Sequence, residues 1–162
     1  MPKVLRIINR LNLGGPTFNA ALLTKYMNPK YETMLIGGKE DKSEESSKFI
    51  LENLGISGIL IEDMHRDLGL KNDRKAFLKI KQIIKEFKPD IIHTHASKAG
   101  ALGRIASLAN GNAKLVHTFH GHVFHSYFGS LKTSFYKNIE RALALKTDKI
   151  IAISERICKI YQ

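Results

Sequence analysis

Four short segments of this chain carry residue types that could bind a polar ligand. The first is the pair Gly14-Gly15, followed by Pro16. A backbone without side chains can approach a ligand closely. A helix is predicted to follow over residues 17–27, and its free N–H groups and positive dipole end would suit a phosphate group. A plain turn is the alternative interpretation of the glycine pair.

The second segment combines histidine, serine, lysine and arginine. His93 and His95 stand two residues apart in a predicted strand, so their side chains would share one face. Ser97 could cap the next helix, and Lys98 would lie in its first turn, where a cation opposes the helix dipole. Such a local conflict often marks function, although a surface lysine is the alternative. Arg104 follows on the same helix. Two glycines on this helix, at positions 100 and 103, would allow close packing on the sheet.

The third segment contains four histidines, at positions 117, 120, 122 and 125. A histidine cluster can hold zinc, but this one has no carboxylate or cysteine beside it, and neither H-E-x-x-H nor C-x-x-C occurs. We therefore expect no metal cofactor. His120, followed by Gly121 at a strand end, is favoured as a hydrogen-bonding group over a ligand. His122 and His125 are interpreted as loop surface or substrate contacts.

In the fourth segment Ser154 begins a last predicted helix, and a plain N-cap is its simplest role.

These segments need a scaffold that gathers them, and strand patterns alternate with helix patterns along the whole chain. Strands are predicted at 3–9, 32–36, 58–61, 90–95, 114–119 and 149–153. Helices are predicted at 17–27, from the capping-box pair Asp41 and Glu44 to 53, from Asp73 to a stop at Pro89, at 97–109, at 130–146 and from 154 onward. Residues 62–72 are predicted to be a loop. The alternation predicts an α/β, Rossmann-like, doubly wound parallel sheet of about six strands, whose ligands bind at the carboxyl ends of the strands.

Composition limits the classes of function. The 162 residues fit one domain, and the single cysteine, Cys158, indicates a reducing compartment. No secretory h-region or membrane span occurs, which favours a cytoplasmic protein.

The net charge of +11 would suit nucleic acid, anionic lipid or a phosphate-bearing substrate, or it could reflect solvated helix faces. Nucleic acid is disfavoured because no known binding motif is present. NAD and P-loop chemistry are disfavoured because G-x-G-x-x-G and G-x-x-x-x-G-K-[ST] are absent.

Taken in order, the strand ends resemble the N-terminal domain of the family 4 (group 1) glycosyltransferases, which have the two-domain GT-B architecture. The resemblance covers essentially the whole chain. It is carried by Gly14-Gly15, by the run from Asp90 to Gly100, by the run from Val116 to Gly121, and by the run from Ile150 to Ser154. The versions here look most like bacterial enzymes that build capsule, exopolysaccharide or the O-antigen of lipopolysaccharide on a lipid carrier.

The resemblance implies a retaining transfer from a nucleotide sugar to a lipid-linked or saccharide acceptor, without an obligatory metal. It implies that Gly14 and Gly15 lie against the donor diphosphate or the acceptor, and that His120 contacts the transferred sugar as the catalytic candidate. It also implies that His95, Ser97 and Lys98 line the acceptor side. Arg104 is a weaker acceptor-binding candidate, and Gly121 and Ser154 are further cleft candidates.

The family's nucleotide-sugar domain is not found in residues 1–162, so we interpret the chain as one N-terminal, acceptor-side domain that lacks its C-terminal partner. We expect this piece alone to be inactive. The acceptor would be selected by the loops at 62–72 and 122–129. The alternative is a non-catalytic Rossmann-like module that docks to an anionic membrane surface or to a partner domain, peripheral to the inner membrane.

Overall fold

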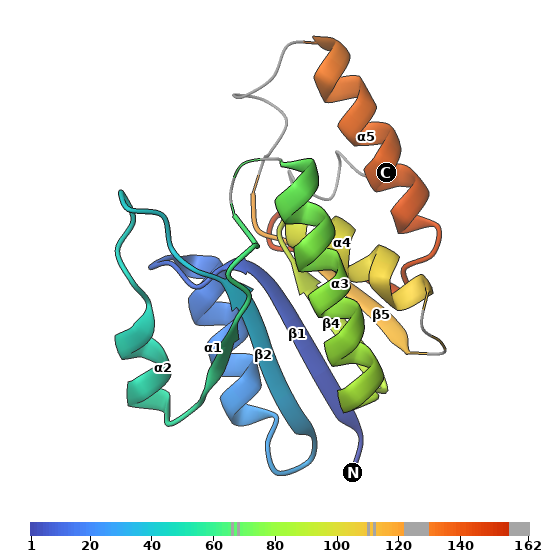
Figure 1. Cartoon of the computed structure of the whole chain (residues 1–162). Coiled ribbons are helices and arrows are strands. Elements are labelled where there is room, and N and C mark those ends of the chain that lie inside the picture. Colours follow the sequence, from blue (N-terminus) through green and yellow to red (C-terminus); the bar gives the residue numbers. More distant parts are fainter. Residues whose placement is uncertain (66, 68, 110, 112, 122–129, 156–162) are drawn as a thin grey trace.

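Six short runs rich in valine, isoleucine and leucine form one parallel sheet. The computed structural model describes residues 1–65, 67, 69–109, 111, 113–121 and 130–155 (Figure 1). The strands are β1 (Lys3–Arg10), β2 (Glu32–Gly38), β3 (Gly58–Leu60), β4 (Ile91–His95), β5 (Lys114–Phe119) and β6 (Lys149–Ala152). Their order is β3-β2-β1-β4-β5-β6, and each neighbouring pair is parallel. This is the doubly wound arrangement that the alternating pattern predicted.

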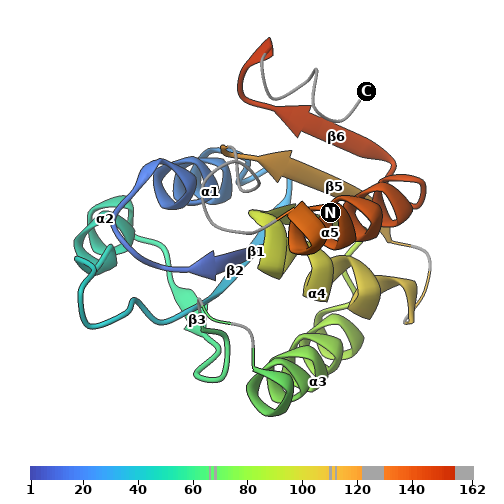
Figure 2. The ribbon, with the colours of Figure 1, turned by 90° about the horizontal axis from the view of Figure 1, so that it is seen from above.

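The helices cover both faces of the sheet. They are α1 (Gly15–Tyr26), α2 (Lys48–Leu54), α3 (Leu70–Phe87), α4 (Ser97–Leu108) and α5 (Ser130–Ala144). Viewed from above, α1 and α2 lie on one face, and α3, α4 and α5 lie on the other (Figure 2). Each face has its own core: Ile8 and Leu35 pack with α1 and α2, while Ile7 and Ile92 pack with α3 and α4. Burial of these apolar side chains on both faces holds the strand ends in place.

The helix expected to begin at Asp41 and Glu44 begins instead at Lys48. The Glu44 carboxylate does accept the backbone N–H of Asp41 at 3.1 Å, as a capping box requires. However, the same carboxylate binds Arg10 on β1, and the N–H of Leu13 donates to the carbonyl of Glu45 at 2.8 Å. These tertiary contacts hold the segment as a turn against the loop after β1, so the local capping signal does not start a helix.

Helix α3 begins at Leu70, three residues before the expected start at Asp73. Asp73 lies inside the first turn, and its Oδ2 accepts the N–H of Gly69 at 3.1 Å. The loop predicted at 62–72 is therefore shorter by three residues, and the bond from the Gly69 N–H to Asp73 holds the first turn of the helix. The helix expected from Ser154, with Cys158, runs into residues outside the described part of the chain. Within the described part, no helix is long and apolar enough to cross a membrane.

Candidate active site at the carboxyl ends of the strands

A row of histidines lies at the carboxyl ends of β4 and β5. His95 Nδ1 is 2.9 Å from His120 Nε2, so one ring donates a hydrogen bond to the other. The ring of His93 lies beside that of His95, with centroids 4.2 Å apart, as expected for two residues on one face of a strand. His93 Nε2 is in turn 2.8 Å from Thr118 Oγ1 on β5. The row therefore joins the two strand ends through side-chain contacts.

Burial keeps these rings neutral near pH 7. Desolvation is the main cause that lowers the pKa of His95 to about 2 and that of His93 to about 4, with smaller contributions from neighbouring histidines and from Arg6. Desolvation also lowers the pKa of the half-buried His120. A neutral imidazole has one donor nitrogen and one acceptor nitrogen, so the row can direct hydrogen bonds but does not present a fixed positive charge.

His117 lies on the opposite face of the sheet, against α4. Its Nδ1 is 2.8 Å from Thr94 Oγ1, and burial is the main cause that lowers its pKa to about 2. A Cβ added at Gly100 would lie 2.5 Å from His117 Cε1, and one at Gly103 would lie 2.8 Å from Thr94 Cγ2. The close helix–sheet packing predicted for these two glycines is therefore confirmed.

The Gly14-Gly15 loop presents an open helix N-terminus at the end of β1. Gly14 is the N-cap of α1, no side chain caps the helix, and its first turn holds no acidic residue. A Cβ added at Gly15 would meet nothing within 4 Å. The loop is held by Thr17, whose Oγ1 donates to the carbonyl of Asn12 at 2.7 Å. Among the described residues, the backbone here is fixed by Thr17 while nothing obstructs the outer side of Gly15, which fits the predicted approach of a ligand.

The turn between β4 and α4 differs from the prediction. Ser97 does not cap the helix: the N-cap is Ala96, at φ 63 and ψ 161, and no side chain caps it. An alanine in this region carries strain of about 1–3 kcal/mol, which surrounding structure must impose. The Ala96 N–H donates to the carbonyl of Thr118 at 3.4 Å. The Ser97 hydroxyl is buried without a hydrogen-bond partner among the described residues. No sequence signal marks this strained alanine.

Lys98 is engaged by helix α3. Its ammonium lies 2.5 Å from Asp73 Oδ1 and also donates to the backbone carbonyl of Asp67. The side chain is 11% exposed. The expected conflict between this cation and the α4 dipole is thus relieved by a carboxylate from a neighbouring helix, an arrangement that the sequence around Lys98 does not reveal.

Arg104 and its partner are enclosed between α4 and α5. Arg104 is fully buried, its Nη2 lies 2.5 Å from Glu140 Oε2, and its Nε donates to the carbonyl of Gly100 at 2.9 Å. Burial raises the pKa of Glu140, and the arginine opposes that shift. The structure therefore does not bring Arg104 to the open edge where His95 and His120 meet.

Of the remaining predicted residues, Gly121 and Ser154 lie at the same edge of the sheet. Gly121 directly follows His120, and a Cβ added there would meet nothing within 4 Å. Ser154 lies exposed just beyond β6. His122 and His125, together with the loop at 122–129, lie outside the described residues. Among the described residues, no group of three or more histidine, cysteine, aspartate or glutamate side chains could hold a metal ion.

Sequence reasoning missed Arg6, which lies inside the apolar run of the first predicted strand. Arg6 is buried on β1 on the face of α1, where its Nη1 is 3.5 Å from Thr24 Oγ1. Desolvation lowers its pKa to about 10, so the guanidinium stays charged at pH 7. Its register partner on β4 is His93. An isolated arginine among buried strand positions was the available signal, because a buried cation is costly without a specific role.

Known proteins share both the sequence pattern and the fold. The profile of Glycosyltransferase Family 4 matches residues 22–162. An Escherichia coli protein described as UDP-Gal:alpha-D-GlcNAc-diphosphoundecaprenol alpha-1,3-galactosyltransferase is 34% identical over 98 residues, which make up 60% of this chain and 25% of that protein. The chain thus matches about a quarter of the length of that relative.

Two solved structures illustrate the fold. A glycosyltransferase from Rickettsia africae ESF-5 has a TM-score of 0.67 at 18% identity, over 98% of this chain and 38% of the other. UDP-GlcNAc 2-epimerase from Methanocaldococcus jannaschii has a TM-score of 0.66 at 11% identity, over 98% of this chain and 41% of the other. The likeness confirms the Rossmann-like fold. Because a transferase and an epimerase share it, the fold by itself does not select a reaction.

Proposed function

The chain belongs to glycosyltransferase family 4, and on that premise we propose that it forms the acceptor-side domain of an enzyme that transfers a sugar from a nucleotide-sugar donor. The acceptor would be a lipid-linked or free saccharide, and the product a bacterial surface polysaccharide such as capsule or lipopolysaccharide. The name of the Escherichia coli relative, with a UDP-sugar donor and a diphosphoundecaprenol acceptor, supports this choice of substrates.

One observation carries the proposal: the open N-terminus of α1 and the His95–His120 pair lie at the carboxyl edge of one sheet. The strands that support them, β1 and β4, are adjacent, and Ile8 is in register with His95. A diphosphate at Gly14-Gly15 would meet the backbone N–H groups of these two glycines and the positive end of the helix dipole, which stabilise charge on a leaving group. Pro16 has no N–H, and those of Thr17 and Phe18 donate to the Gly14 carbonyl. His120, neutral and half-buried, would donate or accept a hydrogen bond at the sugar.

We propose that the transfer proceeds with retention of anomeric configuration and without an obligatory metal. The chain's own contribution would be to bind, orient and desolvate the reacting groups. The donor nucleotide would be held mainly by a second domain, which closes over this edge of the sheet.

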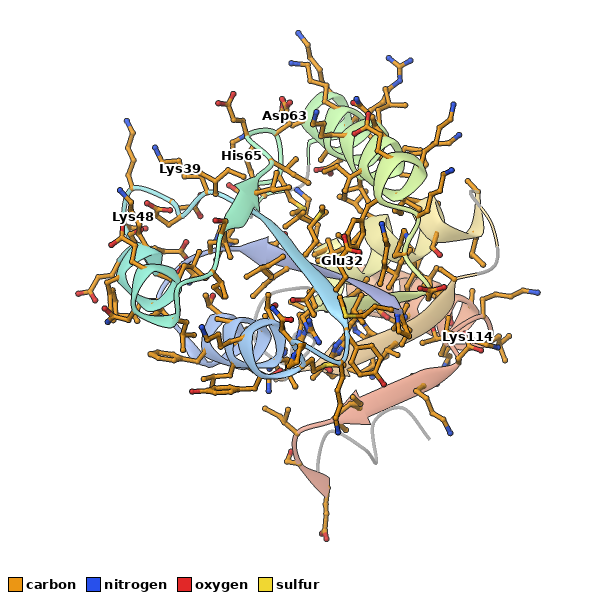
Figure 3. All side chains as sticks on the ribbon, turned by 90° about the horizontal axis from the view of Figure 1, so that it is seen from below. Glu32, Lys39, Lys48, Asp63, His65 and Lys114 are labelled. Carbon is orange, nitrogen blue, oxygen red and sulfur yellow. The ribbon has the colours of Figure 1, made fainter. Side chains whose placement is uncertain are left out.

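The test is His120→Ala in the full-length gene product, assayed with UDP-sugars and a polyprenyl-diphosphate saccharide acceptor. Turnover should fall by about 100-fold or more, with the circular dichroism spectrum unchanged. Lys114→Ala is the matched control, because Lys114 lies exposed at the other end of the same strand (Figure 3). Unchanged turnover in His120→Ala would refute the site assignment.

A second partner, an anionic membrane surface, is favoured by the outer face of α3. This helix carries six basic residues and two acidic ones: Lys71, Arg74, Lys75, Lys79, Lys81 and Lys85 against Asp73 and Glu86. Nitrogen-tipped side chains point outward from it (Figure 3), and Leu70 and Leu78 on the same helix are 95% and 50% exposed. Because Lys98 joins the first turn of α3 to that of α4, this face adjoins the candidate site. A membrane there would present a lipid-linked acceptor.

Binding to vesicles with and without anionic lipid would test this partner. We expect binding that depends on anionic lipid, weakens with salt and survives His120→Ala. Replacing Lys71, Arg74 and Lys75 by glutamine should weaken it by about a factor of 100, at about 1 kcal/mol for each charge. Equal binding to neutral vesicles would refute an electrostatic membrane contact, and no binding to either kind of vesicle would favour a partner domain on this face.

A further inference from the structure

The contact between His95 and His120 contains a single proton whose position is decided by the surroundings of His95. His95 Nδ1 and His120 Nε2 are 2.9 Å apart, and the ring planes are inclined by 26°. Since both rings are neutral near pH 7, one of the two facing nitrogens carries hydrogen and the other accepts it. The direction of this bond fixes which nitrogen of His120 is available to a ligand.

The second nitrogen of His95 indicates the direction. His95 Nε2 is fully buried and has no hydrogen-bond partner among the described residues. If His95 carried its proton on Nε2, a buried N–H donor would be left without an acceptor. If it carries the proton on Nδ1, only a lone pair is left unsatisfied, which folded proteins tolerate more often.

His95 is held rigidly enough to impose this direction. It is the last residue of β4, is 0% exposed, and its ring lies against that of His93. His93 is itself bonded through Nε2 to Thr118 Oγ1 at 2.8 Å. His120, by contrast, is only partly buried at the end of β5. The buried ring of His95 therefore orients the more exposed ring of His120.

We propose that His95 is a positioning residue that holds His120 in the tautomer with its proton on Nδ1, so that His120 meets the ligand as a hydrogen-bond donor and not as a base. Among the described residues, His120 forms its side-chain hydrogen bond through Nε2, to His95, which leaves Nδ1 for the ligand. In this tautomer the free nitrogen has a hydrogen and no lone pair. It would suit an oxygen acceptor on the ligand, such as a sugar hydroxyl or a phosphate oxygen. The identity of that ligand rests on the proposed function, whereas the tautomer does not.

Nitrogen-15 NMR of the chain, labelled at its histidine rings and recorded at pH 7.5 without substrate, reads the tautomer directly. We expect His120 to show a protonated Nδ1 and an unprotonated Nε2, and His95 to show a protonated Nδ1. A protonated Nε2 on His120 would overturn the proposal. Because no substrate is present, this result is independent of whether the protein transfers sugar. Absence of turnover in the full-length protein would count against the proposed function alone.

Variants at His95 test whether this residue imposes the tautomer. His95→Leu removes the donor, and His120 should shift largely to the Nε2–H form that isolated histidines prefer. His95→Asn places an amide donor near the position of Nδ1, and it should retain the Nδ1–H form of His120. The matched control is His117→Asn, a buried histidine bonded to Thr94 on the other face of the sheet, which should leave the His120 tautomer unchanged.

In the full-length protein, His95→Leu should lower kcat by about tenfold or more while changing KM for the donor less, and His95→Asn should restore most of kcat. A purely structural role for His95 predicts a lower yield of folded protein with the tautomer and kcat per folded molecule unchanged. That result, or an Nδ1–H tautomer that persists in His95→Leu, would overturn the proposal.

Discussion

Lys98 and Asp73 form an ion pair that joins the first turn of α4 to the first turn of α3, with Nζ and Oδ1 2.5 Å apart. The two side chains are only 11% and 20% exposed. Because water screens this pair little, it should contribute more than a typical surface pair. It also explains how a lysine is accommodated at the positive end of a helix.

We therefore predict that Lys98→Met and Asp73→Asn each lower the free energy of unfolding by about 1–2 kcal/mol, with a coupling energy of at least about 0.5 kcal/mol in the double variant. Urea denaturation of the four proteins measures this cycle. The pair of Lys75 with Asp63, 56% and 36% exposed, is the control, and its coupling should be smaller. Strictly additive losses for Lys98 and Asp73 would contradict the prediction.

The buried pair of Arg104 with Glu140 predicts a larger effect. Arg104→Met leaves the carboxylate of Glu140 buried without its cation, and it should lower the free energy of unfolding by about 3–5 kcal/mol. Adding Glu140→Leu should recover much of this loss, since two apolar side chains replace both charges. Thermal and urea unfolding provide the comparison. A loss no larger in Arg104→Met than in the double variant would show that the lone carboxylate is tolerated.

The sequence predicted the features of this fold that depend on local pattern. Alternating strand and helix signals predicted all six strands, and the period of two placed His93 and His95 on one face. The Gly14-Gly15 pair predicted a turn or a ligand loop after the first strand, and the structure places it at the start of α1.

Features that depend on distant residues could not be predicted in this way. Glu140 stands 36 positions after Arg104, so nothing near the arginine indicates that it is enclosed. Likewise, the carboxylate that engages Lys98 comes from the preceding helix, and Glu44 is drawn into a turn by Arg10. The contact of His95 with His120 spans 25 positions and requires the β4–β5 pairing. The strand order was likewise fixed only by the structure.

Buried neutral histidines make the stability of the fold depend on pH. Burial lowers the pKa of His93 to about 4 and those of His95 and His117 to about 2, against 6.5 when exposed. Below pH 6.5 the unfolded chain therefore binds protons that the folded chain does not, and stability falls as pH falls toward 4. Each histidine contributes up to about 1.4 kcal/mol per pH unit, so the three together contribute up to roughly 4 kcal/mol per pH unit.

Urea unfolding at pH 7.5, 6.5 and 5.5 tests this dependence. The raised pKa of Glu140 acts in the opposite direction, but it is one group against three. His117→Asn should reduce the slope by about a third, because it removes one of the three titrating rings. A free energy of unfolding that stays constant from pH 7.5 to 5.5 would contradict the burial of these rings.

Two glycine-to-alanine changes separate packing from ligand access. At Gly100 the new methyl group would lie 2.5 Å from His117 Cε1, so Gly100→Ala should lower the free energy of unfolding by about 1–3 kcal/mol. At Gly15 it would meet nothing within 4 Å, and alanine is a better helix former than glycine. Gly15→Ala should therefore leave the free energy of unfolding unchanged or raise it by up to about 1 kcal/mol.

If a diphosphate approaches this loop as we propose, the same methyl group at Gly15 occupies the space next to the ligand. Turnover of the full-length protein should then fall by about tenfold or more in Gly15→Ala, although the fold is as stable as before. The informative measurement is the pair of results on one preparation: urea unfolding and initial rates at several donor concentrations. Full turnover together with unchanged stability would mean that the open side of the loop faces solvent and not the donor. The phosphate site would then have to be sought at another strand end.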